Sequence, residues 1–288
     1  AALGGMAVPA AVALAAAGGA MAGDGAWAIP VATDIVVALG VLAIAGSSLP
    51  AGVRALLLSM AVIDDLIAIT LIAVLFTKGF DPLWLAGGLG ACGLWWLLWR
   101  LRPQPPWALL WALALTAWVC IHASGVHATV TGIVLGLLTP VRPRRGEGES
   151  VGERFEHRLH PISAGVCVPL FALSATGIPI AAISGAIDER VAIGVVAGLL
   201  VGKVVGILGG ARFAVALRIG ALPEGVRWAD VLPVAVLGSI GFTVSLLISQ
   251  LAFDDVELTE RVAAAILLTS VVASAIAVAL LRRRSRPG

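Results

Sequence analysis

Two adjacent acidic residues, Asp64 and Asp65, stand in the middle of a long apolar stretch, residues 51–76. Neighbouring positions on a helix point about 100° apart, so the two carboxylates would diverge and leave room for a small cation such as sodium between them. Hard cations prefer oxygen ligands, and the same oxygens also take up protons. Binding one expels the other, and this competition is the chemistry of a cation/proton exchanger.

Two further ionisable residues, Asp34 and Lys203, also lie in apolar stretches, although a charge there costs about 2.5–3.5 kcal/mol at the centre of a membrane helix. Pro30 comes shortly before Thr33 and Asp34, and it is expected to break the helix there. A second break is predicted in the glycine-containing residues 238–243. Charges beside exposed helix ends would be stabilised by the peptide dipoles. An ion pair that only joins helices remains an alternative for these charges.

The composition identifies the environment that these residues must function in. Hydrophobic residues make up 60% of the 288 residues, charged residues 12%, and the mean hydropathy is +1.04. Soluble domains carry about 45–50% apolar and about 25% charged residues, so the chain is expected to be an all-α polytopic membrane protein. A net charge of +2 gives no argument for nucleic acid. The three cysteines lack metal-ligand spacing.

Ten segments approach the roughly 20 apolar residues that a membrane-spanning helix needs. They form a single transmembrane domain over residues 1–288 and comprise residues 1–21, 28–47, 51–76, 82–99, 107–124, 126–140, 161–178, 191–210, 231–252 and 262–281. The only sizeable polar stretch is the loop 141–160. Its second half, residues 151–160, is predicted to form an interfacial helix that ends at Pro161.

The distribution of basic residues predicts the orientation of these segments. One set of alternate loops holds fifteen arginines, while the other holds only Lys78, Arg190 and Arg261. Cytoplasmic loops carry the excess of basic residues, so the C-terminus and the 141–160 loop are predicted to be cytoplasmic. The C-terminus then lies on the same side as residue 1.

Six motifs in order along the chain resemble the NhaA family of bacterial sodium/proton antiporters. They are residues 27–34, 63–66, 124–129, 154–161, 198–203 and 238–243. The resemblance implies a twelve-helix fold of the bacterial inner membrane, with inverted repeats and two broken, crossing helices. The ten segments would be its helices three to twelve, with the first two absent from this chain. It also implies a possible homodimer of the full-length protein, embedded in membrane lipid.

The resemblance further implies what individual residues do. Asp64 and Asp65 would bind sodium and protons; Thr33, Asp34 and Lys203 would compensate charge at the broken helices, with Lys203 able to pair with Asp64. A cytoplasmic cluster would sense pH: Glu156, His157 and His160. Incidental histidines on a solvated helix remain the alternative for that cluster. The implied activity is exchange of cytoplasmic sodium or lithium for external protons, in sodium and pH homeostasis, with no catalytic residue and no cofactor.

Three other functions are weighed against exchange. An intramembrane aspartyl protease needs two aspartates on opposite helices, with a tyrosine beside one of them, and this sequence has no tyrosine. A sodium-coupled symporter of an organic anion would share the general architecture but would not need Lys203. A channel conducts through weakly bound sites, whereas adjacent acids bind cations tightly.

Overall fold

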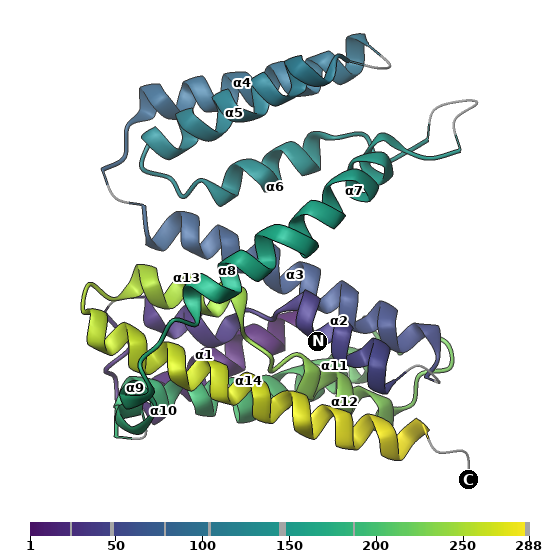
Figure 1. The fold of residues 1–288 in the computed structure, drawn as a ribbon. Coiled ribbons are helices and arrows are strands. Elements are labelled where there is room, and N and C mark those ends of the chain that lie inside the picture. The colour runs from purple at the N-terminus through teal and green to yellow at the C-terminus, as the bar shows by residue number, and fades with distance from the viewer. Residues whose placement is uncertain are drawn as a thin grey trace. The chain divides into compact units, whose positions relative to one another are not determined.

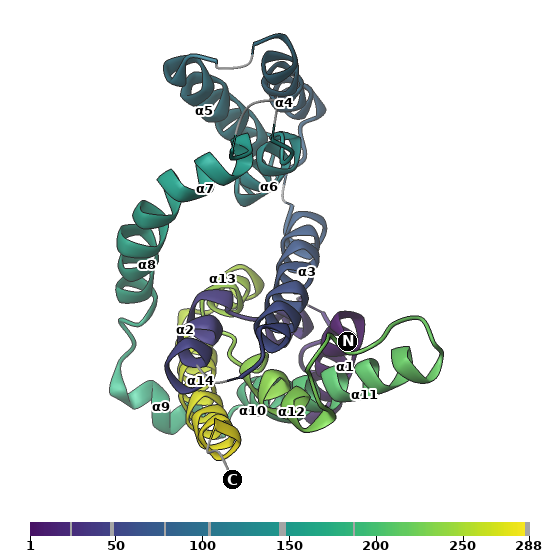
Figure 2. The same cartoon turned by 90° about the vertical axis from the view of Figure 1, so that its right-hand side faces the viewer.

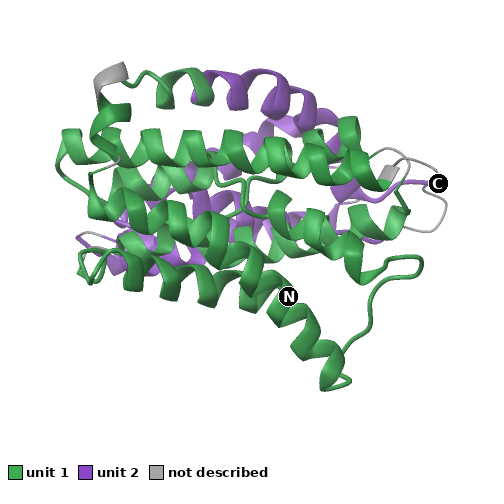
Figure 3. Ribbon diagram, turned by 90° about the horizontal axis from the view of Figure 1, so that it is seen from below, with its two compact units in different colours: residues 1–68, 172–288 green, residues 69–171 purple. Residues whose placement is uncertain are grey.

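The computed structural model describes residues 1–23, 25–46, 49–77, 79–102, 105–143, 148–186 and 188–285, and all regular structure in these ranges is helical (Figures 1 and 2). The chain divides into two compact units (Figure 3). Unit 1 combines Ala1–Ala68 with Ala172–Gly288, and unit 2 is Ile69–Phe171. Each unit is described by itself.

Unit 1 holds both ends of the chain and all four ionisable residues predicted to lie inside membrane segments. Helix α3 (Ala51–Leu75) begins in unit 1, and α8 (Val168–Ala175) ends in it. Its other elements are α1 (Ala2–Ala16), the 3₁₀-helix η1 (Ala26–Val31), α2 (Ile35–Ala45), α9 (Ile180–Ala186), α10 (Arg190–Ala197), the π-helix η3 (Gly198–Gly202), α11 (Lys203–Ala216), α12 (Trp228–Leu237), α13 (Thr243–Ala252) and α14 (Val256–Ser285).

Unit 2 contains α4 (Pro82–Leu101), α5 (Trp107–Ala123), α6 (Thr129–Leu138), α7 (Val151–Ile162) and the π-helix η2 (Ser163–Cys167). Asp81 caps α4 by accepting hydrogen bonds from the Leu83 and Trp84 amides, and Pro82 occupies the first helical position, where a missing N–H is harmless. Ser150 and Glu153 form a reciprocal capping box at the start of α7. These local signals fix where both helices begin.

Six helical stretches are long and apolar enough to cross a membrane: Ala26–Ala45, Ala51–Leu75, Pro82–Leu101, Val151–Ala175, Arg190–Ala216 and Val256–Arg284. The predicted class, an all-helical polytopic membrane protein, agrees with this. Five further apolar helices are shorter, at 10–17 residues. These helix lengths do not determine how many segments cross the membrane, so the count of ten stays a prediction. Two of the ten, residues 28–47 and 231–252, are interrupted helices, as their proline and glycine signals indicated.

The predicted end of the interfacial helix at Pro161 is wrong. Helix α7 runs through Pro161 to Ile162 and passes directly into η2 and α8, so helix continues from Val151 to Ala175. A proline inside a helix removes one backbone hydrogen bond, and the following residues Ser163–Cys167 adopt the wider π-turn. The local change of helix type absorbs the disturbance that was expected to end the helix.

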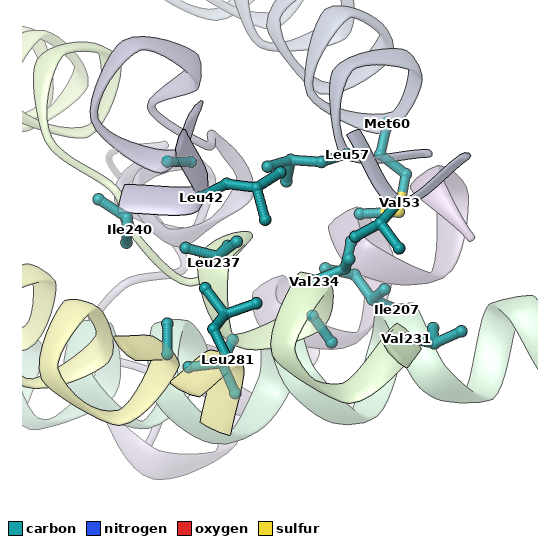
Figure 4. Close-up of a cluster of buried hydrophobic side chains, with 14 of the residues drawn as sticks. Leu42, Val53, Leu57, Met60, Ile207, Val231, Val234, Leu237, Ile240 and Leu281 are labelled. Carbon is teal, nitrogen blue, oxygen red and sulfur yellow. The ribbon is translucent and has the colours of Figure 1, made fainter. Parts of the chain in front are cut away.

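The core of unit 1 lies where α2, α3, α11, α12 and α14 meet (Figure 4). Leu42, Leu57, Val234 and Leu237 point into it and are almost entirely removed from solvent. In a membrane such packing gains little from the hydrophobic effect and is stabilised mainly by close van der Waals contact. The cluster includes Ile240, so it surrounds the interruption between α12 and α13.

Helix α1 packs against the continuous stretch α10–η3–α11 through glycines spaced four residues apart, and Figure 2 shows α1 beside α11. The glycines are Gly194, Gly198, Gly202, Gly206 and Gly210. A Cβ on Gly202 would lie 2.6 Å from Pro9 Cα, and one on Gly206 would lie 2.2 Å from the Gly4 carbonyl oxygen. Small residues let the two backbones approach this closely. Lys203 lies next to this stripe and is fully buried.

Gly206→Ala should therefore destabilise the protein by about 1–3 kcal/mol, because overpacking forces the two backbones apart. Gly209→Ala is the matched control, since a Cβ there meets nothing within 4 Å on the same helix. The control should be neutral or slightly stabilising, because alanine is the better helix former. The thermal unfolding midpoint in detergent measures both. Equal midpoints for the two variants would contradict the close contact between α1 and α11.

Candidate functional site

Two short non-helical segments meet inside unit 1, one between η1 and α2 and the other between α12 and α13, and their meeting point is called the crossing. The Asp34 backbone N–H donates to the Ile240 carbonyl oxygen at 2.7 Å, which joins the two interruptions directly. Interruption leaves the peptide groups of four half-helix ends without intrahelical partners. Inside a membrane these groups must be satisfied by the protein itself.

One carboxylate serves the N-terminal ends of two half-helices. Asp34 Oδ1 accepts from the Val37 N–H of α2 at 3.0 Å, and Asp34 Oδ2 accepts from the Thr243 N–H of α13, also at 3.0 Å. The Asp34 side chain is buried, with 3% of its surface exposed. A negative charge at two positive helix ends is the favourable electrostatic arrangement. This is the geometry that charge compensation by Asp34 requires.

Side-chain donors reach the carbonyl groups around the two interruptions. Lys203 Nζ donates to the Val31 carbonyl oxygen, and Ser245 Oγ donates to that of Ile29 at 2.8 Å, so η1 has two donors at its C-terminal end. Across the crossing, Thr33 Oγ1 donates to the Gly238 carbonyl oxygen at 2.9 Å.

A fourth side-chain donor, the hydroxyl of Ser270 on α14, lies 3.4 Å from the Gly241 carbonyl oxygen and 2.8 Å from that of Ile266. Ser245 and Ser270 were not among the predicted site residues. Serine hydroxyls in helices commonly bond the carbonyl four residues earlier, so the sequence carries no signal that separates a long-range partner from a local one.

Asp64 lies at the edge of this crossing. Its Oδ2 accepts from Lys203 Nζ at 2.8 Å and from Thr33 Oγ1 at 3.0 Å, and the Asp64 and Lys203 side chains are 1% and 0% exposed. The Thr33 hydroxyl has a single hydrogen, so it can donate to Asp64 or to Gly238 but not to both at once. The Asp64 carboxylate and the Gly238 carbonyl oxygen, at the interruption between α12 and α13, therefore compete for the hydrogen of the Thr33 hydroxyl.

Two carboxylate oxygens of the site remain open. In the part of the chain that the structure describes, the buried atoms Asp64 Oδ1 and Asp65 Oδ1 have no hydrogen-bond partner. A buried charged oxygen without a partner is costly, so each is suited to a proton or a small cation. Since Lys203 offsets one of the two aspartates, the ionised site carries one net negative charge.

The predicted pH-sensing residues lie in unit 2, on α7, whereas the carboxylate pair lies in unit 1. Glu156, His157 and His160 are all exposed. His157 Nδ1 lies 3.7 Å from Glu149 Oε1, an ion pair when the imidazole is protonated. Glu156 lines a cavity bounded by α4, α5, α6 and α7. These three residues are therefore close in the sequence, but their side chains have different surroundings in the structure.

The fold and the site define a class of protein: a secondary transporter with a charged site at the meeting point of two interrupted helices. The sequence model of the family described as "Na+/H+ antiporter 1" matches residues 1–281, so the chain belongs to this family of sodium/proton antiporters. The family membership expected from the six motifs is confirmed. The chain is a multi-pass protein of the bacterial plasma membrane and not an enzyme.

Similar proteins include several antiporters from bacteria. Na(+)/H(+) antiporter NhaA 1 of Saccharopolyspora erythraea is 50% identical over 288 residues, which cover 99% of this chain and 69% of the relative. Na(+)/H(+) antiporter NhaA of Nocardia farcinica is 48% identical over 288 residues, with the same two coverages. Na(+)/H(+) antiporter NhaA 2 of Rhodococcus jostii is 47% identical over 291 residues, covering 99% of this chain and 71% of the relative.

Proposed function

We propose that this antiporter exchanges sodium or lithium ions for protons at Asp64 and Asp65. The observation that carries the proposal is the pair of buried carboxylate oxygens, Asp64 Oδ1 and Asp65 Oδ1, that lack partners within the described residues. The ionised site has one net negative charge because Lys203 offsets Asp64. One cation or one proton neutralises it. The two occupants compete for the same oxygens, and this competition couples their movements.

Three side chains fix the position of the interrupted helices relative to the carboxylates: those of Thr33, Asp34 and Lys203. Asp34 stabilises two N-terminal ends, and Lys203 bridges Asp64 to the C-terminal end of η1. A change of occupancy at Asp64 alters what Lys203 and Thr33 bind, and both also contact carbonyl groups of the crossing segments. A movement of these segments in response would open the site to alternate sides of the membrane. Alternating access of this kind completes the exchange cycle.

The finer topology and direction belong to the same proposal. The ten segments correspond to helices three to twelve of a twelve-helix fold, the first three and the last three form the inverted repeats, and residues 1–288 act as one transmembrane domain. The excess of arginines in alternate loops supports a cytoplasmic C-terminus. Cytoplasmic sodium then leaves in exchange for external protons, driven by the proton gradient. This activity would serve sodium and pH homeostasis.

Glu156, His157 and His160 are proposed to report cytoplasmic pH to the transporter. Histidine is the side chain suited to a change of charge in the physiological pH range, and a protonated His157 would form an ion pair with Glu149. Both groups are exposed, so this pair alone contributes little to stability and acts through the local position of α7. The full-length protein is further proposed to form a homodimer in the lipid bilayer.

Sodium-dependent proton movement in everted membrane vesicles that contain the full-length protein tests the exchange. After respiration acidifies the lumen, added Na⁺ or Li⁺ should dissipate the pH gradient, while K⁺ serves as the control ion. A pH-sensitive dye measures the response. Gradients that ignore Na⁺ and Li⁺ would refute exchange. A response that appears only with an added organic anion would favour the symporter instead.

Asp34→Asn should reduce exchange in a graded way. The asparagine carbonyl oxygen can accept from either Val37 or Thr243, but its NH₂ group would face the other N–H, so one helix end loses its cap. A partly buried dipole interaction is worth about 2 kcal/mol at most. We expect weaker apparent sodium affinity or a shifted pH dependence with measurable exchange, read from activity against sodium and pH.

Asp34→Lys should be far more damaging, because it places a positive charge against two positive helix ends. The comparison of both variants separates an electrostatic role from direct ion binding. If folded Asp34→Asn protein were inactive at every sodium concentration and pH, Asp34 would be a direct ligand and its role as a shared helix cap would be wrong.

A further inference from the structure

A cavity in unit 2 is lined by none of the residues assigned to transport at the carboxylate pair. It has a volume of about 410 Å³, opens to one side, and is lined by residues of α4, α5, α6 and α7. Cavities that bind organic molecules fall in the range of about 300–1,000 Å³. Its wall carries the rings of Trp95, Trp107, Trp111 and Phe155. The cavity is therefore large enough for a small organic molecule, and four aromatic rings form part of its mainly apolar wall.

Two glycines keep this cavity open. Gly132 and Gly136 lie one helical turn apart on α6 and line the cavity, and a Cβ built on either meets nothing within 4 Å. The glycines of the α1–α11 contact differ, since a Cβ on Gly206 would meet the Gly4 carbonyl oxygen. Side chains at positions 132 and 136 would therefore extend into the cavity. The free volume of the cavity therefore depends on glycine at positions 132 and 136.

The wall of the cavity carries few polar side-chain atoms, and two of its polar side chains bond each other. Trp95 Nε1 donates to Thr139 Oγ1 at 3.2 Å, and Thr139 Oγ1 donates to the Leu135 carbonyl oxygen at 2.7 Å. The remaining lining is aromatic, aliphatic or glycine apart from Glu156. Glu156 is the one ionisable lining residue in the described part of unit 2, and it is exposed. The cavity thus combines aromatic rings with a single carboxylate.

This combination selects the charge and the size of a ligand. A bare sodium ion would find one carboxylate and too few other oxygens to replace its water. An anion would be repelled by Glu156. An organic ammonium ion matches both features, because the carboxylate supplies the counter-charge and the rings of Trp95 and Trp111 can attract a cation. Trp107 contributes less, since it stacks on the phenylalanine ring of the wall and the Arg158 guanidinium already lies over its ring. We propose that this cavity binds an amphiphilic organic monocation, an alkyl- or arylammonium ion, with its charged group at Glu156.

Equilibrium dialysis of the purified full-length protein in a non-ionic detergent tests the proposal. The probe is (naphthylmethyl)trimethylammonium, whose charge does not depend on pH, and naphthylmethanesulfonate is its anionic counterpart. The protein should bind the ammonium probe and not the sulfonate. Equal binding of both probes, or of neither, would overturn the proposal.

Glu156→Gln should weaken binding of the ammonium probe by about tenfold, in line with a charge-assisted contact at an aromatic site. Glu153→Gln is the matched control: it removes a carboxylate from the same helix that does not line the cavity, and glutamine can keep the capping box. The control should bind the probe as the parent protein does. An unchanged Glu156→Gln, or an equal loss in both variants, would show that the carboxylate of Glu156 is not the partner.

Gly136→Leu should fill the cavity and abolish probe binding. Gly132→Leu fills the same space from the neighbouring turn, and either variant is used only if its thermal unfolding midpoint matches that of the parent. Binding that survives in a folded filled variant would place the probe elsewhere. Lipid nanodiscs complete the test: binding lost with phosphatidylethanolamine but kept with phosphatidylglycerol would mean that a lipid ammonium group occupies the cavity, which would overturn the assignment to a free organic cation.

Discussion

Asp65→Asn is expected to reduce sodium-dependent proton movement to the background of vesicles without the protein. Asparagine keeps the shape of the side chain but removes its charge. With Asp64 held by Lys203 at 2.8 Å, the altered site would carry no net charge and would offer a cation no compensation for leaving water. It would also lose a group that can take up and release a proton. The expected loss is therefore complete and cannot be restored by raising the sodium concentration.

Asp255→Asn provides the matched control for this prediction. Asp255 is exposed and accepts a hydrogen bond from the Glu257 N–H at 2.9 Å, a contact that asparagine can keep. The control should retain full exchange. Both variants must also show unfolding midpoints close to that of the parent protein. Substantial exchange by folded Asp65→Asn protein would remove Asp65 from the ion-binding site.

Local signals in the sequence predicted where the helices break and that Asp34 and Lys203 would compensate charge there, but not which distant residues these side chains would contact. Pro30 and the glycines of residues 238–243 act on their own backbone, so they could be interpreted without knowledge of the fold. The contact between Asp34 and Thr243 spans 209 residues. Nothing in the spacing of an acid and a distant threonine indicates that a folded chain will bring them together.

Two features were missed for different reasons: the glycine contact had a signal in the sequence that was not used, and the helix through Pro161 had none. The glycines at four-residue intervals from Gly194 to Gly210 were visible in the sequence, and their helical period could have predicted the close contact with α1. The passage of α7 through Pro161 had no such signal. A proline normally favours a helix end, and nothing in the local sequence distinguishes this proline, which the following π-turn accommodates, from one that ends a helix.

Lys203→Ala is expected to cost about 3–5 kcal/mol of folding stability, because it leaves the buried Asp64 carboxylate without its cation. Lys203 and Asp64 are 0% and 1% exposed, so little solvent screens their interaction. The variant also leaves the Val31 carbonyl oxygen without its ammonium donor. Arg212→Ala on the same helix is the control, since Arg212 is exposed and makes a cation–π contact with Trp228 that is worth about 0.5–1 kcal/mol.

A double-mutant cycle separates the ion pair from other effects of Lys203. If the pair is the main interaction, Asp64→Asn should also be destabilising, and Lys203→Ala combined with Asp64→Asn should cost less than the sum of the two single changes. Residues in direct contact typically couple by about 0.5–3 kcal/mol. The free energies of unfolding in detergent give this coupling directly. Strictly additive losses would show that Lys203 stabilises the protein through the end of η1 rather than through Asp64.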